Sequence, residues 1–257
     1  MLKVRIIPIV LLKGYSVVKS IRFTEMRNLG NPIVIARIYN SRNVDELVLL
    51  DIDASKNGSK IDSFTVEDVA SECFMPLTVG GGLKSLEDIA EMLAKGADKV
   101  ALNASARADE DFITRASEVF GAQCIVASID VITIDGTYFV YSHENAIATA
   151  MNPIEWARRL EALGAGEILL NSVSNDGMMK GCDLELVRLI CDAVSLPVIA
   201  VGGVSCPEDA VAVVAQGASA VGAASIFHFT SHTPQCLRNA CEANGYPVRK
   251  HFEIEFK

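Results

Sequence analysis

The second half of this chain repeats the first. The segment Gly81–Ala97 returns as Gly202–Ala218, with matched glycines and acidic residues lying 121 positions apart. This period is far longer than the roughly 20–50 residues of solenoid repeats. It indicates two fused halves of similar fold, about residues 1–121 and 122–257, and no Pro-, Gly- or Ser-rich linker separates them. We therefore expect one domain over residues 1–257.

Short apolar runs alternate with longer amphipathic segments. The apolar runs predict strands at Arg5–Leu11, Glu46–Asp51, Leu77–Val79, Lys99–Leu102, Cys124–Asp130, Glu167–Asn171, Val198–Val201 and Ala220–Ala223. The amphipathic segments predict helices at Pro32–Arg42, Ser63–Cys73, Ser85–Lys95, Asp109–Phe120, Pro153–Leu163, Asp183–Ala193, Pro207–Gln216 and Pro234–Asn244. Near-continuous Val, Ile and Leu are typical of parallel strands buried on both faces. Eight such units predict an α/β fold, a (β/α)₈ barrel, whose active sites lie at the carboxyl ends of the strands.

Composition excludes several classes of function. A net charge of −9 argues against a nucleic-acid surface, which would be basic. The apolar runs are shorter than the roughly 18 residues that a membrane span needs. Seven cysteines without a C-x-x-C pair indicate reduced thiols and a cytoplasmic protein. No His, Cys and Asp cluster has metal-ligand spacing, so we expect no metal, and no motif indicates a cofactor.

Glycine pairs follow the third and seventh predicted strands, at Gly81-Gly82 and Gly202-Gly203. Glycines at a strand-to-helix turn let backbone N–H groups approach an anion closely. Short helical starts after the neighbouring strands could add free N–H groups, at Asn103 and at Ala224-Ser225. A single glycine pair could simply form a tight turn, but two related pairs predict two phosphate sites at opposite edges of the barrel mouth. The expected ligand is a small molecule with a phosphate at each end.

These motifs resemble the HisF family, the cyclase subunit of imidazole glycerol phosphate synthase. The resemblance covers residues 4–229 and includes the segments Asp51–Ser55, Thr78–Gly82, Gly96–Val100, Gly164–Leu170 and Ala224–Phe229. The loop with Asp176 and Gly177 also matches, which places both among the expected phosphate-site residues. The resemblance implies a half-barrel duplication that binds a bisphosphorylated ribulosyl compound. It also implies a HisH-like glutaminase partner, whose ammonia crosses the barrel to the mouth.

In that family two aspartates at strand ends, one from each half, act as general acid and base. Asp130 ends the fifth predicted strand and matches one of them, but Leu11 stands where the other is expected. Lys19 persists in the following loop, and Asp51 ends the second strand, where its expected role is to hold loop residues by hydrogen bonds. Leucine transfers no proton, and a positioned acid or base contributes roughly 10²–10⁴-fold in rate. This substitution counts against the cyclase reaction.

The resemblance also implies an ammonia gate at the opposite, amino-terminal end of the barrel. The family's four charged gate positions are filled here by Arg5, Glu46, Lys99 and Glu167, which we call the floor ring. A buried ionic ring adds little net stability compared with an apolar plug, so its presence favours ammonia passage over a purely structural role. Asp98 matches a family contact to the glutaminase.

Three functions remain open. We favour an ammonia-delivering and docking subunit that serves amidation of a sugar in surface-polysaccharide biosynthesis, as in some HisF-like paralogues, with a sugar amidotransferase as a further partner. The second is a working cyclase, a lyase of histidine biosynthesis that uses Asp130. The third, a phosphosugar isomerase, also calls for paired acids and leaves the floor ring without a purpose. Among the histidines, we expect His143 in a hairpin-like insertion over the mouth and His228 as a packed residue.

Overall fold

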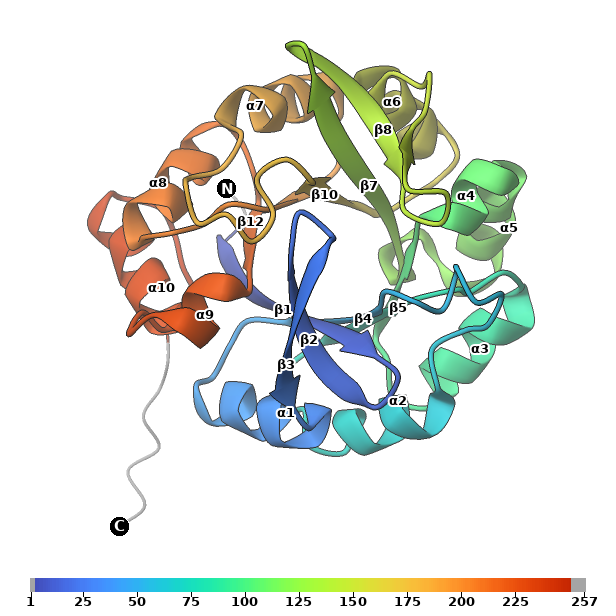
Figure 1. The fold of residues 1–257 in the computed structure, drawn as a ribbon, viewed down its shortest axis with the longest axis horizontal. Coiled ribbons are helices and arrows are strands. Elements are labelled where there is room, and N and C mark those ends of the chain that lie inside the picture. Colours follow the sequence, from blue (N-terminus) through green and yellow to red (C-terminus); the bar gives the residue numbers. More distant parts are fainter. Residues whose placement is uncertain (1–2, 251–257) are drawn as a thin grey trace.

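The computed structural model describes residues 3–250 and shows a closed parallel barrel ringed by helices (Figure 1). The barrel strands are β1 (Arg5–Lys13), β4 (Leu47–Asp51), β5 (Leu77–Gly80), β6 (Lys99–Leu102), β7 (Ile125–Ile134), β10 (Glu167–Ser172), β11 (Val198–Val201) and β12 (Ala220–Ala223). Each pairs in parallel with the next, β12 pairs with β1, and pairing of β7 with β10 completes the circle. The predicted (β/α)₈ barrel is confirmed.

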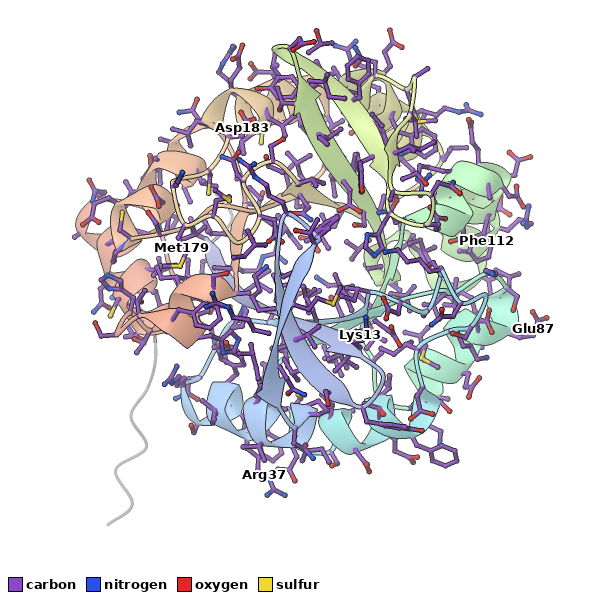
Figure 2. The ribbon with its side chains drawn as sticks, viewed as in Figure 1. Lys13, Arg37, Glu87, Phe112, Met179 and Asp183 are labelled. Carbon is purple, nitrogen blue, oxygen red and sulfur yellow. The ribbon has the colours of Figure 1, made fainter. Side chains whose placement is uncertain are left out.

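The helices cover the outside of the barrel. The longer ones are α1 (Pro32–Ser41), α2 (Ser63–Ala70), α3 (Leu86–Ala94), α5 (Asp111–Phe120), α6 (Pro153–Ala162), α7 (Leu184–Ala193), α8 (Pro207–Ala215) and α10 (Pro234–Ala243). Their polar faces carry side chains such as Arg37 and Glu87, which point away from the barrel at its rim (Figure 2). No helix within residues 3–250 is both long enough and apolar enough to cross a membrane.

Local sequence signals explain where these helices begin and end. Proline occupies the first turn of α6, α8 and α10, where its missing N–H costs no helical hydrogen bond. Ser85 and Asp88 form a reciprocal capping box at the start of α3. Gly96 and Gly217 follow α3 and α8 with φ of 98° and 102°, a conformation that favours glycine.

Two apolar layers hold the barrel together. The larger lies between the strands and the surrounding helices. The smaller fills the barrel interior, where Ile7, Val48, Val126, Leu169 and Ile199 are 0–2% exposed. Strand side chains alternate between these two layers, which explains the near-continuous apolar runs in the sequence.

Additional elements extend over the carboxyl ends of the strands. β2 (Ser16–Ile21) and β3 (Glu25–Gly30) form an antiparallel hairpin on β1, and β8 (Thr137–Ser142) and β9 (Ile147–Ala148) extend β7. The second extension carries His143 in the expected insertion, whereas the first hairpin is not predicted from the sequence. Two five-residue helices, α4 (Ala104–Ala108) and α9 (Ser225–Phe229), follow β6 and β12, and η1 (Ala122–Cys124) precedes β7.

Candidate functional site

A cavity of about 540 Å³ opens at the carboxyl ends of the barrel strands. The structure brings together at this cavity all the residues that the sequence places at the mouth. They are Leu11, Lys19, Asp51, Gly81, Gly82, Asn103, Asp130, Asp176, Gly177, Gly202, Gly203, Ala224 and Ser225. The volume lies within the range typical of small-molecule sites.

The first glycine turn, between β5 and α3, is closely packed. Gly81 and Gly82 have φ of 127° and 68°, in the region that favours glycine. A Cβ on Gly81 would lie 2.7 Å from the Asp51 carbonyl oxygen, and one on Gly82 would overlap the carbonyl oxygen of Ser59. Only glycine allows the backbone to run so close to the neighbouring loop.

The second turn, between β11 and α8, repeats this geometry. Gly202 and Gly203 have φ of 103° and 100°. A Cβ on Gly202 would lie 2.7 Å from the Ser172 carbonyl oxygen, and one on Gly203 would overlap the Gly181 carbonyl oxygen. The two turns therefore share positive φ angles and close packing against the preceding loop. Phosphate binding at both turns stays a prediction.

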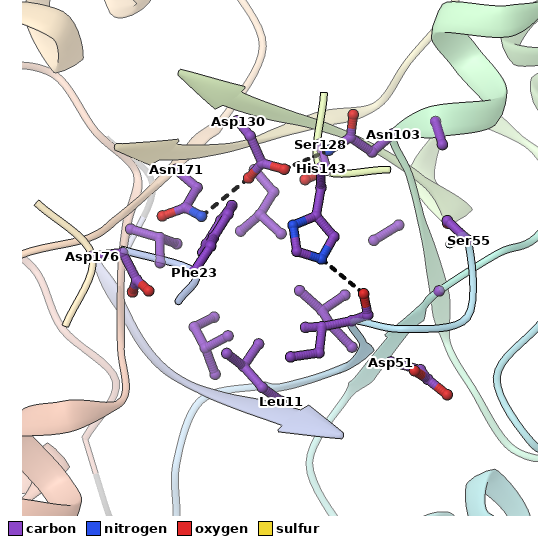
Figure 3. A pocket seen from close by; sticks show the side chains of 18 of the residues that line it. Leu11, Phe23, Asp51, Ser55, Asn103, Ser128, Asp130, His143, Asn171 and Asp176 are labelled. Carbon is purple, nitrogen blue, oxygen red and sulfur yellow. Dashed lines mark hydrogen bonds between the residues drawn. The ribbon is translucent and has the colours of Figure 1, made fainter. Parts of the chain in front are cut away.

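Asp130 lies in the cavity at the inner face of β7, only 8% exposed (Figure 3). One carboxylate oxygen accepts a hydrogen bond from Asn171 Nδ2 at 3.0 Å, and the other accepts one from Asn103 Nδ2 at 2.9 Å. Burial raises the pKa of Asp130, against the hydrogen bonds from both amides and the charges of His143 and Arg107. A carboxyl with a raised pKa is suited to proton transfer near neutral pH.

Leu11 lies at the corresponding strand end in the first half. The β1–β4 register pairs Leu11 with Leu50, and the β7–β10 register pairs Asp130 with Asn171. Leu50 and Asn171 are themselves 121 positions apart. The repeat therefore places an apolar pair where the other half has a carboxylate and an amide, and Figure 3 shows Leu11 across the cavity from Asp130.

Two further carboxylates at the mouth are held by hydrogen bonds to neighbouring groups in the fold. Asp176 accepts a hydrogen bond from Lys19 Nζ at 2.7 Å and one from Ser20 Oγ at 3.3 Å, so it joins the β10–α7 loop to the β2–β3 hairpin. Asp51 accepts hydrogen bonds from the backbone N–H groups of Asp53 and Ala54, the loop-holding role expected for it. Burial raises the pKa of Asp51, and these two bonds oppose the shift.

Sequence reasoning missed several polar residues that line the cavity, among them Asn171 and His143. Asn171 ends a predicted strand, so the rule that strand-end polar residues face the mouth could have found it. His143 was placed over the mouth but not in the site. Its Nε2 lies 2.8 Å from the Ile52 carbonyl oxygen, and its ring meets Phe23 edge to face at 5.1 Å. No local signal in the sequence indicates this contact, which joins loops from the two halves.

The floor ring closes the opposite end of the barrel. Glu46 Oε2 accepts hydrogen bonds from Arg5 at 2.9 Å and from Lys99 at 3.1 Å. Glu167 also accepts from both cations, with Lys99 at 2.9 Å. Burial opposes the charge on Arg5, but its hydrogen bonds and charge interactions with Glu167 and Glu46 outweigh this effect and raise its pKa. The two cations and two anions form a continuous ring.

The surface next to the floor ring carries Asp98, which is exposed and immediately precedes Lys99. One carboxylate oxygen of Asp98 accepts a hydrogen bond from the Leu77 backbone N–H at 2.8 Å. Its other oxygen makes no hydrogen bond or ion pair with any residue from 3 to 250. A partner contact by Asp98 stays a prediction.

Comparison with known proteins agrees with this architecture. Residues 5–233 match the model of a family described as histidine biosynthesis protein. This chain belongs to that family. It is also 49% identical over 249 residues to a Campylobacter jejuni protein named "Putative imidazole glycerol phosphate synthase subunit hisF2", covering 97% of this chain and 99% of that protein. The histidine biosynthesis family and this similarity confirm the resemblance to HisF and identify the chain as a HisF-type subunit.

Proposed function

We propose that this HisF-type protein receives ammonia from a HisH-like glutaminase at its floor and delivers it through the barrel to the mouth. On this proposal a separate amidotransferase completes the amidation of a sugar in surface-polysaccharide biosynthesis. The observation that carries the proposal is a complete floor ring combined with Leu11 in place of an acid.

The geometry of the floor ring supports a gate more than a structural plug. Glu46 and Glu167 side chains are 2% and 7% exposed, and each is paired with both cations. An apolar plug of equal volume would often be as stable or more stable than such a ring. An ionic ring, however, can rearrange its pairs and admit a small polar molecule. A contribution to stability alone therefore does not explain why four charged residues occupy the floor of the barrel.

The interior above the ring suits neutral ammonia. Its inward side chains include Ile7, Val48, Val126 and Leu169, all apolar and buried. Transfer of a charged ammonium ion into such surroundings is very costly, whereas a small neutral molecule loses only its hydrogen bonds to water. The interior thus favours passage of NH₃ over that of NH₄⁺. It also protects ammonia from protonation before it reaches the mouth.

The mouth itself is poorly equipped for paired acid–base catalysis. Asp130 is buried with a raised pKa, but its counterpart Leu11 lies in an apolar cluster with Ile9 and Leu50. Loss of one of two proton-transfer groups corresponds to roughly 10²–10⁴-fold in rate. This favours delivery of ammonia to another protein over ring closure inside the barrel.

A second candidate is the cyclase reaction itself, which would form imidazole glycerol phosphate with Asp130 as the remaining acid–base group. It is favoured by the two amides that hold the Asp130 carboxylate and by the glycine turns at both edges of the cavity. Both candidates share the glutaminase partner and the phosphorylated ligand. They differ in whether turnover occurs on this chain.

The deciding experiment supplies the family's bisphosphorylated ribulosyl substrate and ammonium salt to the purified chain and measures imidazole glycerol phosphate. We expect formation at least about 10²-fold below that of a HisF cyclase assayed in parallel. Leu11→Asp should raise the rate, and Leu11→Asn, of similar size but without an acid, should not. Product formation by the unmodified chain at rates comparable to the HisF cyclase would refute the favoured proposal.

Ammonia delivery needs its own test, in a mixture of this chain, the glutaminase, the proposed amidotransferase and its sugar acceptor. With glutamine labelled with ¹⁵N at the side-chain amide and an excess of unlabelled ammonium in solution, the amidated product should carry ¹⁵N. Product labelled only from free ammonium would contradict passage through the barrel.

A further inference from the structure

The cavity has two long walls of opposite chemistry. The glycine turns lie after β5 and β11, on opposite sides of the barrel, so a ligand joining them would pass between β1 and β4 on one side and β7 and β10 on the other. The first wall presents Leu11 and Leu50, and the second presents Asp130 and Asn171. The same backbone register therefore carries an apolar pair on one wall and a polar pair on the other.

The apolar wall is broader than these two leucines. Ile9, Met26 and Ile52 also line the cavity and pack in the same cluster as Leu11 and Leu50. This cluster continues downward into the buried barrel interior. A ligand hydroxyl directed at these five apolar side chains would lose water without gaining a hydrogen bond, and an apolar group would gain contact area.

The polar wall accepts hydrogen bonds. The Asp130 carboxylate takes one amide N–H on each oxygen and has further lone pairs available. Next to it, His143 Nε2 donates a hydrogen bond to the Ile52 carbonyl oxygen, which can only accept. A ligand therefore meets this wall best through O–H or N–H groups.

We infer that the mouth binds a phosphorylated ligand with two unlike sides, an aliphatic side packed on Leu11 and Leu50 and a side with O–H or N–H donors facing Asp130. Leu11 is then the residue that determines specificity against polyhydroxylated phosphates. This inference rests on the phosphorylated ligand proposed above but is independent of ammonia passage.

Two ring phosphates of equal ring size test this inference by isothermal titration calorimetry. One is 2-hydroxycyclohexyl phosphate, with a single donor and an otherwise aliphatic ring, and the other is myo-inositol 1-phosphate, hydroxylated all round. Inorganic phosphate gives the baseline. The unmodified protein should bind the aliphatic ring at least about tenfold more tightly than the inositol, the discrimination typical of a small apolar contact.

Variants of the apolar wall test whether its leucines cause this preference. Leu11→Asn should reduce the preference at least about fivefold, because the amide can bond a ligand hydroxyl where leucine cannot. Leu50→Asn, at the half-buried position paired with Leu11, should also reduce the preference for the aliphatic ring. This second variant keeps the test decisive where Leu11→Asn fails to fold. Ile134→Asn, at the exposed tip of the β7–β8 hairpin, should leave the preference unchanged.

Each other outcome overturns the inference in a distinguishable way. Equal or tighter binding of the inositol, or a preference unmoved by both leucine variants, removes the role of the apolar wall and leaves ammonia delivery intact. Absence of binding by both ring phosphates and by inorganic phosphate removes the phosphorylated ligand as well. The ¹⁵N experiment then still decides ammonia passage.

Discussion

Removing Lys99 from the floor ring is expected to destabilise the protein strongly. In Lys99→Met the Glu46 and Glu167 carboxylates keep only one cation of the ring, Arg5, although Glu46 still accepts a hydrogen bond from Thr78 Oγ1. The ring then changes from neutral to a net negative charge. Loss of one partner from a buried ion pair costs about 3–5 kcal/mol. The Lys99 side chain is 20% exposed, so water reaches part of the vacated space. We therefore expect about 3 kcal/mol, the lower end of that range, which corresponds to a fall of about 6–12 °C in Tm.

Urea denaturation followed by circular dichroism measures this loss, and two further variants test its cause. Lys95→Met makes the same substitution in an exposed pair with Glu67, 29% and 55% exposed, and should cost less than about 1 kcal/mol. Lys99→Met combined with Glu167→Gln restores neutrality and should regain most of the loss. The reasoning fails if Lys99→Met is no worse than Lys95→Met, or if the double variant is the least stable of all.

Two other predictions concern the mouth. Gly82→Ala should destabilise the protein by about 1–3 kcal/mol or more, and by more than Gly58→Ala. Both glycines have φ of 68°, but only at Gly82 would a Cβ overlap a neighbour. Equal losses of stability for the two variants in urea denaturation would contradict the packing argument. Asp130→Asn should gain stability relative to the unmodified protein as pH rises above the ordinary carboxyl pKa of about 3.9. Burial raises the pKa of Asp130 in the folded protein above its unfolded value. The stability that its protonated form contributes is therefore fully present at low pH and is lost as pH rises through the folded-state pKa. Parallel denaturation curves from pH 4 to 8 check this, and a gain confined to acid pH would refute it.

The barrel could be predicted because its signals are local. Buried parallel strands require apolar side chains on both faces, and helix ends require caps and glycines, so strands such as Leu77–Gly80 and the Ser85 capping box are readable from short segments. The β2–β3 hairpin lacked such a signal. Its turn places Arg22 and Phe23 at φ of 47° and 63°, where Asn or Gly would be expected.

The site could be predicted only in part, because the repeat locates strand ends but not contacts across the cavity. It placed Asp130 and Leu11 at the mouth, yet the amide support from Asn171 depends on the β7–β10 register. The ion pair of Lys19 with Asp176 joins residues 157 positions apart. Such contacts depend on how the loops fold over the barrel, which no local pattern encodes.

Comparison of the two halves of the repeat distinguishes residues that the fold requires from residues that it does not. Gly82 and Gly203 occur in both halves because any side chain would overlap the adjacent loop, whatever the protein binds. Leu11 and Asp130 both line the same cavity, and the fold accommodates an apolar residue in one half and a carboxylate in the other. Because packing permits either residue there, the difference between the halves is best explained by the molecule that the cavity receives. The asymmetry is therefore informative about function in a way that the shared glycines are not.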